Sequence, residues 1–466
     1  MAHRIFTLLE TAQHELWLFS AIFLLLGGLD ALCVDAIWIA RRVYRRWTFY
    51  RITPPLRAHQ LPTPSDDKLL AIFVPAWGEA AVIGTMLQHC TRQWYHSPCR
   101  HRIYVGCYPN DPKSAAAVIN AARSNMHIQL VLVRHDGPTT KADCLNRLWH
   151  ALLADEIAGE FKAKAIILHD AEDAVHADEL HVFNCLVLKG GAVQLPVIPV
   201  RTAHSLWISG HYCDEFAEAH GKNMVVREAL GAPLPLAGVA CAIDRNLMAR
   251  MAMLNDGLPF DPNSLTEDYE LGIRIGSVGG RTIMARVLDS DGELVATRAC
   301  FPDTLTASVR QKTRWLIGIA LAGWDRIGWR GKLAQKWMLL QDRKSIFAAV
   351  VIVAAYVCII LTAILSGAQL LGAYQPARFP PTLVLLLWLN LALLLWQLAV
   401  RASFVAALYG PKEAFISVPR SLISNIIAIM AARRACTAYV RHCLGVPLKW
   451  DKTTHHTVPE ILAGRD

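Results

Sequence analysis

Three carboxylates stand within four residues, directly after a short apolar run. The run is Ala165–Leu168, and the carboxylates are Asp170, Glu172 and Asp173. Ligands of α/β sheets bind where strands end, and carboxylates gathered at such an edge repel one another unless a cation lies between them. Hard oxygen ligands suit Mg²⁺ or Mn²⁺, especially when substrate phosphates complete the coordination. The stretch predicts a metal site, and its alternative is an acidic first turn of a helix.

Two other stretches have residues that could bind a nucleotide whose phosphates meet the metal. Residues 69–75 form a strand-like run that leads into a turn ending at Glu79, and such a turn offers backbone N–H groups. Residues 137–146 pair a turn with a helix start, where Lys141 could meet a phosphate and Asp143 a base or a ribose hydroxyl. For the second stretch, an ordinary helix cap by a threonine is the alternative.

Asp268 is the candidate general base. It belongs to Thr266-Glu267-Asp268, which opens a predicted helix at the mouth of the sheet. The alternative is a plain helix cap, because Ser264 and Glu267 satisfy the Ser-x-x-Glu pattern. Residues 236–245 are mostly small, so a ligand could approach the backbone closely there, although a tightly packed turn would use the same residue types.

An amide, a cation and an aromatic ring follow in one short stretch, at Gln311, Arg314 and Trp315. Arginine is the natural bidentate partner of a diphosphate, and aromatic faces stack on sugar rings. The alternative is a basic helix at a membrane surface, where Trp and Arg are common.

The elements that must position these residues are a sheet and its helices. Strand-like and helix-like runs alternate from Lys68 to about Gln341, after a Pro-rich linker at 52–64. This alternation predicts a mostly parallel sheet with helices on both faces.

Apolar blocks on both sides of this region predict membrane segments. Hydrophobic residues make up 54 % of the 466, and mean hydropathy is +0.30. Residues 16–40, 346–371 and 382–400 are long and apolar enough to span a bilayer. Residues 414–439 are interrupted by a proline and several arginines, so we expect an amphipathic helix in the interface there.

The charge pattern predicts an orientation. Five arginines between residues 41 and 51 place the end of the first span in the cytoplasm and the N-terminus outside. Asp30 and Asp35 fall within the first apolar block. Either they face protein or water at membrane depth, or the helix leaves the bilayer before Asp35.

Composition and charge indicate which classes of binding partner to expect. The net charge of +9 favours anionic lipid or phosphorylated substrates, and the sequence has no nucleic-acid-binding motif. The twelve cysteines form no C-x-x-C pair, which favours reduced thiols over a zinc site or disulfides.

Taken in order, the motifs resemble those of the membrane-embedded family 2 glycosyltransferases, which include cellulose and hyaluronan synthases. More narrowly, residues 137–146, 169–173 and 450–455 resemble the NfrB-like bacterial proteins, also called phage adsorption protein B. The resemblance runs from residue 16 to about residue 456. The set comprises Val74-Pro75…Glu79, Lys141-Ala-Asp143, Asp170-Ala-Glu172-Asp173, Thr266-Glu267-Asp268 and Gln311-x-x-Arg314-Trp315.

The resemblance implies a role for each matched residue. Asp268 matches the catalytic base, and Asp170 matches the first Asp of the D-x-D motif for metal and diphosphate. Glu172 stands where most relatives have Asp, and Asp173 follows, so the second metal ligand stays open between them. Donor contacts are implied for Pro75, Glu79, Lys141, Asp143, Asp170, Gln311 and Arg314, and acceptor contacts for Gly238, Cys241, Glu267 and Trp315.

The implied fold is a GT-A-type glycosyltransferase domain flanked by transmembrane helices and an interfacial amphipathic helix. The expected segments are an N-terminal transmembrane helix with its basic flank, the cytoplasmic GT-A domain, a transmembrane hairpin, and the interfacial helix with a cytoplasmic tail. Their boundaries are 1–51, 52–342, 343–410 and 411–466. A C-terminal domain like cyclic di-GMP sensors, frequent in NfrB-like proteins, is expected to be missing.

The implied function is an inverting transferase of the bacterial inner membrane. It would use a UDP-sugar, such as a UDP-N-acetylhexosamine, to extend a glycan acceptor and build a cell-surface polysaccharide, with an outer-membrane export partner. Three other functions stay open: transfer of one sugar to polyprenyl phosphate, a non-catalytic membrane scaffold in a surface-glycan or phage-receptor system, and a transporter with Asp30 and Asp35 in a proton path. The Q-x-x-R-W stretch argues against transfer to polyprenyl phosphate. The intact carboxylates argue against a non-catalytic scaffold, and the large soluble domain argues against a transporter.

Overall fold

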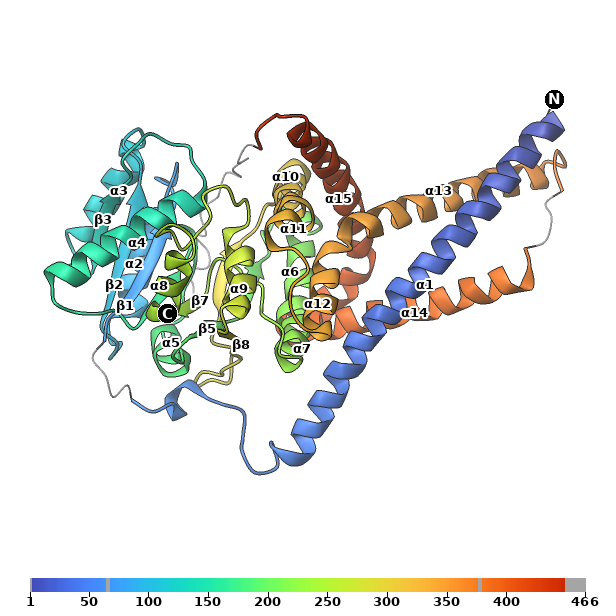
Figure 1. The fold of residues 1–466 in the computed structure, drawn as a ribbon. Helices are drawn as coiled ribbons and strands as arrows, with labels where there is room; N and C mark the ends of the chain where they lie inside the picture. The colour runs from blue at the N-terminus through green and yellow to red at the C-terminus, as the bar shows by residue number, and fades with distance from the viewer. Residues whose placement is uncertain (1, 64–67, 376–378, 449–466) are drawn as a thin grey trace.

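The structure, a computed structural model, describes residues 2–63, 68–375 and 379–448 (Figure 1). The tail motif at 450–455 and Arg378 in the expected hairpin loop lie outside these residues. A sheet with helices on both faces forms one side of the molecule, and long helices form the other (Figure 1).

The main sheet has seven strands in the order β3-β2-β1-β4-β7-β5-β8. Only β7 runs antiparallel to its neighbours β4 and β5, so the prediction of a mostly parallel sheet is confirmed. Two further strands, β6 and β9, pair beside it. The strands are β1 Leu70–Pro75, β2 His101–Cys107, β3 Ile128–Leu132, β4 Ala165–Leu168, β5 Gly191–Gln194, β6 Val197–Val200, β7 Cys241–Asp244, β8 Arg281–Met284 and β9 Thr297–Cys300.

The core is built on both faces of the central strands. On β1, Leu70, Ile72 and Val74 pack on one face, while Ala71 and Phe73 pack on the other. The first face is covered by α2 (Ile83–Gln93), α3 (Pro112–Ala122) and α5 (Glu179–Leu186). The second is covered by α4 (Lys141–Ala158), α8 (Arg245–Met253) and α9 (Glu267–Ser277). A strand buried on both faces explains the continuous apolar run of β1.

The remaining helices join the sheet to the membrane segments. In chain order they are α6 Ile208–Glu218, the π-helix η2 Ala219–Asn223, α7 Met224–Ala229, α10 Leu305–Leu316, the π-helix η3 Ile317–Leu321, α11 Ala322–Ile327 and α12 Leu333–Arg343; a short 3₁₀ turn, η1 Ala58–Gln60, precedes the sheet.

Among the described residues, four helices are long and apolar enough to cross a membrane: α1 Ala2–Thr48, α13 Ser345–Leu370, α14 Pro381–Tyr409 and α15 Pro411–Cys443. α1 packs along α13 and α14, as Figure 1 shows. The first three contain the spans predicted from the sequence, although α1 extends well beyond residues 16–40 at both ends.

α15 was expected to lie in the interface, yet its length and composition also suit a span. It packs against α10, α6 and α14. Its Arg420 is fully buried and donates to Asp214 on α6 at 2.6 Å and to Glu413 at 2.6 Å. One face of α15 is therefore fixed to the globular domain, as expected of a helix that lies in the membrane interface. The placement of α15 in the interface stays a prediction.

Two carboxylates of α1 hold the membrane helices against the globular domain. Asp30 accepts hydrogen bonds from three side chains at the end of α12, namely Trp337 (2.7 Å), Gln341 (2.6 Å) and Lys344 (2.5 Å). Asp35 is 2 % exposed. It accepts from Lys222 of η2 at 2.6 Å and from Trp396 of α14 at 2.8 Å. Both carboxylates face protein, as one of the two interpretations requires. Whether the helix leaves the bilayer before Asp35 stays a prediction.

We predict that Lys222→Met destabilises the chain. Lys222 is 4 % exposed and also pairs with Glu218 at 2.7 Å, so its loss leaves the buried Asp35 without a cation. Losing one partner of a buried ion pair costs about 3–5 kcal/mol. Thermal unfolding of the purified protein measures the effect, with the exposed Lys189→Met as the matched control. Equal unfolding temperatures for the two variants would show that the ion pair carries no stability.

Candidate active site

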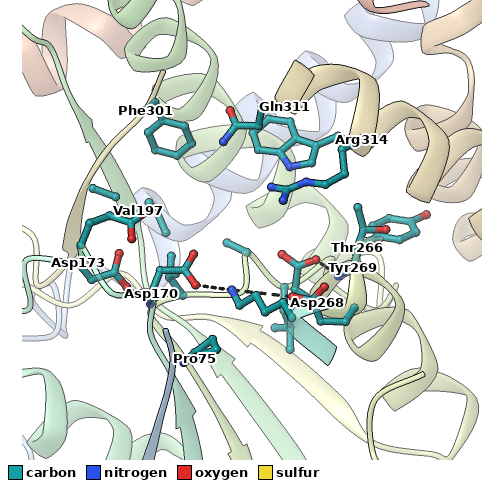
Figure 2. Close-up of a pocket in the computed structure, with 18 of the residues that line it drawn as sticks. Pro75, Asp170, Asp173, Val197, Thr266, Asp268, Tyr269, Phe301, Gln311 and Arg314 are labelled. Carbon is teal, nitrogen blue, oxygen red and sulfur yellow. Dashed lines mark hydrogen bonds and ion pairs between the residues drawn. The ribbon is translucent and has the colours of Figure 1, made fainter. Parts of the chain in front are cut away.

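A cavity of about 420 Å³ opens at the C-terminal ends of β1 and β4 (Figure 2). The ends of these strands supply Pro75 and Asp170, α9 supplies Glu267 and Asp268, and α10 supplies Gln311. In parallel strands the carboxyl ends meet at one edge, so motifs far apart in the sequence gather here.

The floor of the cavity is an ion cluster around Lys141. Its ammonium lies 2.5 Å from Asp170 Oδ1 and 3.9 Å from Glu267 Oε1, and donates to the carbonyl of Gly238 at 3.4 Å. Burial alone would lower the pKa of Lys141, but Asp170, then Glu267 and Asp268, raise it above its ordinary value. Lys141 therefore stays charged. It begins α4, where Thr140 caps the helix by accepting from Asp143 N–H at 3.2 Å, so the cap and the site coexist.

Asp268 is the second residue of α9 and lies across the cavity floor from Asp170 (Figure 2). Its Oδ1 accepts from the N–H of Tyr269 at 2.7 Å. Burial raises the pKa of Asp268, which Lys141 offsets in part. Burial and the neighbouring Asp268 raise the pKa of Glu267 to about 7. A raised pKa suits a carboxylate that must take a proton near neutral pH.

The expected cap of α9 has a different geometry. Thr266 is the N-cap residue but makes no side-chain cap hydrogen bond. Ser264 instead accepts from the N–H of Thr266 at 3.2 Å and donates to Glu270 at 2.6 Å. The backbone of Gly318 in η3 lies so close that an added Cβ would stand 2.4 Å from Thr266 Oγ1. This close approach fixes α10, which precedes η3, relative to the start of α9.

Gly238 lies against Asp268 and Lys141. It has φ +73°, and a Cβ added there would lie 2.7 Å from Asp268 Oδ2 and 3.2 Å from Lys141 Nζ. Both the backbone conformation and the close approach require glycine. A side chain at this position would therefore displace Asp268 or Lys141.

A buried network orients the end of β4. His169 is fully buried between Asp173 (Nδ1 to Oδ2, 2.8 Å) and Glu179 (Nε2 to Oε1, 2.7 Å). Burial alone would lower the pKa of His169, but Glu179 and Asp173 raise it to about 10. Asp173 also accepts from the N–H of Asp170 at 3.0 Å. Its carboxylate is therefore engaged in holding the turn that presents Asp170.

The carboxylates fit a divalent cation only with help from a ligand. The described residues contain no group of three or more His, Cys, Asp or Glu arranged to hold a metal. Asp170 and Glu172 line the cavity with hard oxygen donors. One or two carboxylates completed by substrate phosphates are typical of Mg²⁺ sites, so this donor set fits the predicted ion once a diphosphate is bound.

The side chains Gln311 and Arg314 form the roof, facing the ion cluster (Figure 2). Gln311 Oε1 is buried and has no hydrogen-bond partner in the described part of the chain. Trp315 also lines the cavity, with the ammonium of Lys312 5.0 Å from its ring centre. The π-helix η3 directly follows these residues, and such π-helical turns are frequent at functional sites.

Three residues predicted to contact a ligand do not line the cavity, namely Gly238, Cys241 and Asp143. Gly238 was expected at the acceptor and instead lies against Asp268 and Lys141. Cys241 was expected at the acceptor, but it begins β7 with 0 % exposure and packs in the core under the sheet. Asp143 does not line the cavity; its carboxylate accepts from Thr139 at 2.8 Å and lies 3.3 Å from His135 Nε2. Glu79 does line the cavity, although it is only 5 % exposed.

The structure adds residues that the motifs did not indicate. Trp77 lies edge-to-face with Tyr108, with ring centres 5.2 Å apart, on the side of the cavity next to Thr139. Trp77 belongs to the turn between Pro75 and Glu79, and its place as an aromatic residue just after a strand end could have indicated it. The far wall comes from α6, η2 and the end of β9, which no motif marked, and includes Glu215, Phe216, His220 and Phe301.

Comparison with known proteins identifies the class. A sequence model described as glycosyltransferase like family 2 matches residues 67–318. This match covers more than half of the chain, which therefore belongs to glycosyltransferase family 2. The resemblance, the GT-A-type fold and the presence of a glycosyltransferase domain are thus confirmed.

Two curated relatives are similar to this chain over most of its length. Bacteriophage adsorption protein B of Escherichia coli (strain K12) is 35 % identical over 459 residues, which cover 93 % of this chain and 61 % of the relative. Bacteriophage N4 adsorption protein B of Escherichia coli O157:H7 gives the same values. The chain thus spans about three fifths of the length of these relatives.

Two solved structures are also similar. One is a mannosyltransferase of Pyrobaculum calidifontis in complex with GDP-Man and Mn²⁺, with TM-score 0.49, 17 % identity, and coverage of 88 % of this chain and 98 % of that one. The other is glucosyl-3-phosphoglycerate synthase of Mycobacterium tuberculosis, with TM-score 0.37, 16 % identity, and coverage of 60 % and 87 %.

We predict that Gly238→Ala impairs catalysis by displacing Asp268. The new Cβ must push the carboxylate away, and an error of about 1 Å in placing a reacting group costs about a hundredfold in rate. Release of nucleoside diphosphate measures the rate. Gly231→Ala is the matched control, because Gly231 also has positive φ (+66°) but nothing within 4 Å of an added Cβ. Similar rates for both variants would contradict the role given to Gly238.

Proposed function

We propose that this chain is an inverting glycosyltransferase of a bacterial inner membrane, which uses a nucleotide sugar to build a cell-surface polysaccharide. The observation that supports it best is the placement of Asp268 and of Asp170, which pairs with Lys141, at two ends of one cavity floor beneath Gln311 and Arg314 (Figure 2). This arrangement separates a base from a phosphate-binding side within one cavity.

The donor lies with its diphosphate between floor and roof. Lys141 and Arg314 supply the positive charge that a leaving diphosphate needs, and both are in place before the reaction, so little reorganisation is required. Trp77 and Tyr108 bind the base of the nucleotide, which we propose is uracil. A bound Mg²⁺ or Mn²⁺ would be held by Asp170 and Glu172 and would neutralise the diphosphate.

Asp268 accepts the proton of the acceptor hydroxyl. The hydroxyl oxygen then attacks the anomeric carbon as the bond to the diphosphate breaks. Because the base and the diphosphate side lie across the cavity from each other, attack comes from the face opposite the leaving group, and the configuration inverts. Trp315 and Phe301 offer aromatic faces on which sugar rings of the acceptor stack.

The membrane helices determine where the product goes. We propose that the catalytic domain faces the cytoplasm, because Arg41 to Arg51 follow the first span. The growing glycan then leaves along the membrane helices toward an outer-membrane partner. The position of α6 and η2 supports this route for the glycan. These helices form the far wall of the cavity, on the proposed acceptor side, and they also contact α14 and α1.

We predict that Asp268→Asn folds and binds UDP like the parent but loses turnover by about 10²–10⁴, because it lacks the general base. A helix cap in this position would instead lower the unfolding temperature and leave turnover intact. Polymer synthesis and UDP affinity are measured together, with the exposed Asp291→Asn as control. Near-parent polymer synthesis by the Asp268 variant would remove this residue from the mechanism.

We predict that Asp170→Asn weakens donor binding and abolishes its dependence on Mg²⁺ or Mn²⁺. Asp173→Asn should instead lower thermal stability while metal dependence persists, because its carboxylate serves His169 and the backbone. UDP binding is titrated with and without each metal. The assignment is reversed if Asp173→Asn loses metal dependence and Asp170→Asn keeps it.

We predict that cysteine labelling of intact cells separates the two sides of the membrane. In a background in which the exposed native Cys33 and Cys443 are replaced by serine, a cysteine at Ser124 should stay unlabelled by an impermeant maleimide until lysis. A cysteine at Leu371, which is 86 % exposed at the end of α13, should be labelled. Labelling of the Ser124 position in intact cells rejects a cytoplasmic domain.

A further inference from the structure

A second cavity of about 540 Å³ lies at the C-terminal half of α9, and none of its lining residues belongs to the first cavity. It is enclosed by the ends of α8 and α9 and by the segment from α11 to α12. Four arginines line it, and it has no acidic lining residue. The arginines are Arg227, Arg274, Arg326 and Arg330. We call this space the arginine cavity.

Two of these arginines have carboxylate partners outside the cavity, and two do not. Arg227 pairs with Asp342 at 2.7 Å, and Arg326 pairs with Glu270. Arg274 and Arg330 make no side-chain hydrogen bond or ion pair with any other described residue. The arginine cavity therefore holds a surplus of positive charge.

A fifth arginine adds to this surplus. Arg343 lies on the same face of α12 as Leu339, one turn further along, and is 4 % exposed. Within the described chain, none of its three guanidinium nitrogens has a hydrogen-bond partner. Its guanidinium is held between the rings of Trp324 and Trp329, at 4.9 and 4.8 Å. Burial opposes the charge and lowers the pKa of the Arg343 guanidinium more strongly than the nearby Asp342 carboxylate raises it, so an anion here would be favoured.

The remaining lining selects the type of anion. Pro233, Met251, Leu254, Ile273 and Leu339 give the cavity an apolar wall beside the arginines. Its volume falls in the range of small-molecule sites, roughly 300–1,000 Å³. Guanidinium groups bind phosphate oxygens in pairs, and two guanidiniums without partners match the two charges of a phosphate. An organic body carrying phosphate suits both the wall and the arginines.

A chain of contacts joins the arginine cavity to the base. Arg326 pairs with Glu270, which accepts from Ser264 at 2.6 Å, and Ser264 accepts from the N–H of Thr266 at 3.2 Å. Thr266 stands two residues before Asp268. An anion that draws Arg326 away from Glu270 would loosen the turn that presents the base.

We propose that the arginine cavity is an effector site for a phosphate-bearing small molecule, separate from the donor site, whose binding alters the setting of Asp268. The binding half of this proposal goes beyond the proposed function and does not depend on it. Only the effect on the base rests on sugar transfer.

The test uses the full chain in nanodiscs of neutral phosphatidylcholine, with the donor site saturated by UDP. Pyrophosphate is titrated by calorimetry. The parent should bind it, and Arg274→Ala with Arg330→Ala should bind at least about tenfold more weakly, because loss of one hydrogen bond to a charged group has an effect of this order. Unchanged UDP affinity shows that the double variant is folded.

The control is Arg92→Ala with Arg123→Ala, which removes the same charge from exposed positions away from both cavities and should bind pyrophosphate like the parent. Discs that contain phosphatidylglycerol identify the source of the phosphate. If phosphatidylglycerol weakens pyrophosphate binding, and does so only when Arg274 and Arg330 are present, the lipid headgroup competes for the site and is the source of the phosphate. If pyrophosphate binds equally in both kinds of disc, the ligand is a soluble molecule.

Three results overturn the proposal: no binding of pyrophosphate by the UDP-saturated parent, equal affinity in the Arg274/Arg330 variant, or equal weakening in the Arg92/Arg123 control. The coupling is read from UDP release, which pyrophosphate should change in the parent and leave constant in the Arg274/Arg330 variant. A chain that binds pyrophosphate but releases no UDP from any donor contradicts the proposed function and leaves the site itself intact.

Discussion

The candidate site depends on one half-buried ammonium group. Lys141 lies 2.5 Å from Asp170 and 3.9 Å from Glu267, and Asp268 adds to the field that keeps it charged. These carboxylates come from the end of β4 and the start of α9, which are almost a hundred residues apart. Gathered in one cavity without a cation, they would repel one another. The lysine therefore allows the phosphate side and the base side to share one cavity, and Gly238 leaves room for the contact.

The same principle operates where the globular domain meets the membrane helices. Asp30 and Asp35 of α1 are satisfied by α12, by η2 and by a tryptophan of α14. The π-helix η2 also supplies His220 to the wall of the cavity. A displacement of α1 or α14 must therefore act on the acceptor side of the site. Polar residues in an apolar helix are expensive, and here each is compensated by a partner in the globular domain.

Much of the site could be predicted from the sequence, because parallel strands bring their carboxyl ends to one edge and the motifs follow those ends. The contacts that were predicted wrongly or not predicted depend on strand register and on packing between segments far apart in the sequence. Cys241 faces the core because the register of β7 decides the direction of its side chain, and a shift of one residue reverses it. Likewise, the partners of Asp30 and Asp35 lie about 190 to 360 residues away in the chain, and nothing near those carboxylates indicates them. The wall formed by α6 and η2 arises from packing and has no motif of its own.

The central claim is that the cavity around Lys141 transfers sugar from a nucleotide donor. The most direct measurement is the release of UDP by membranes that contain the chain, when a panel of UDP-sugars is added in the presence of Mg²⁺ or Mn²⁺. The account predicts release from at least one donor, abolished by a chelator and absent from membranes without the chain. No release above that background from any donor in the panel would contradict it.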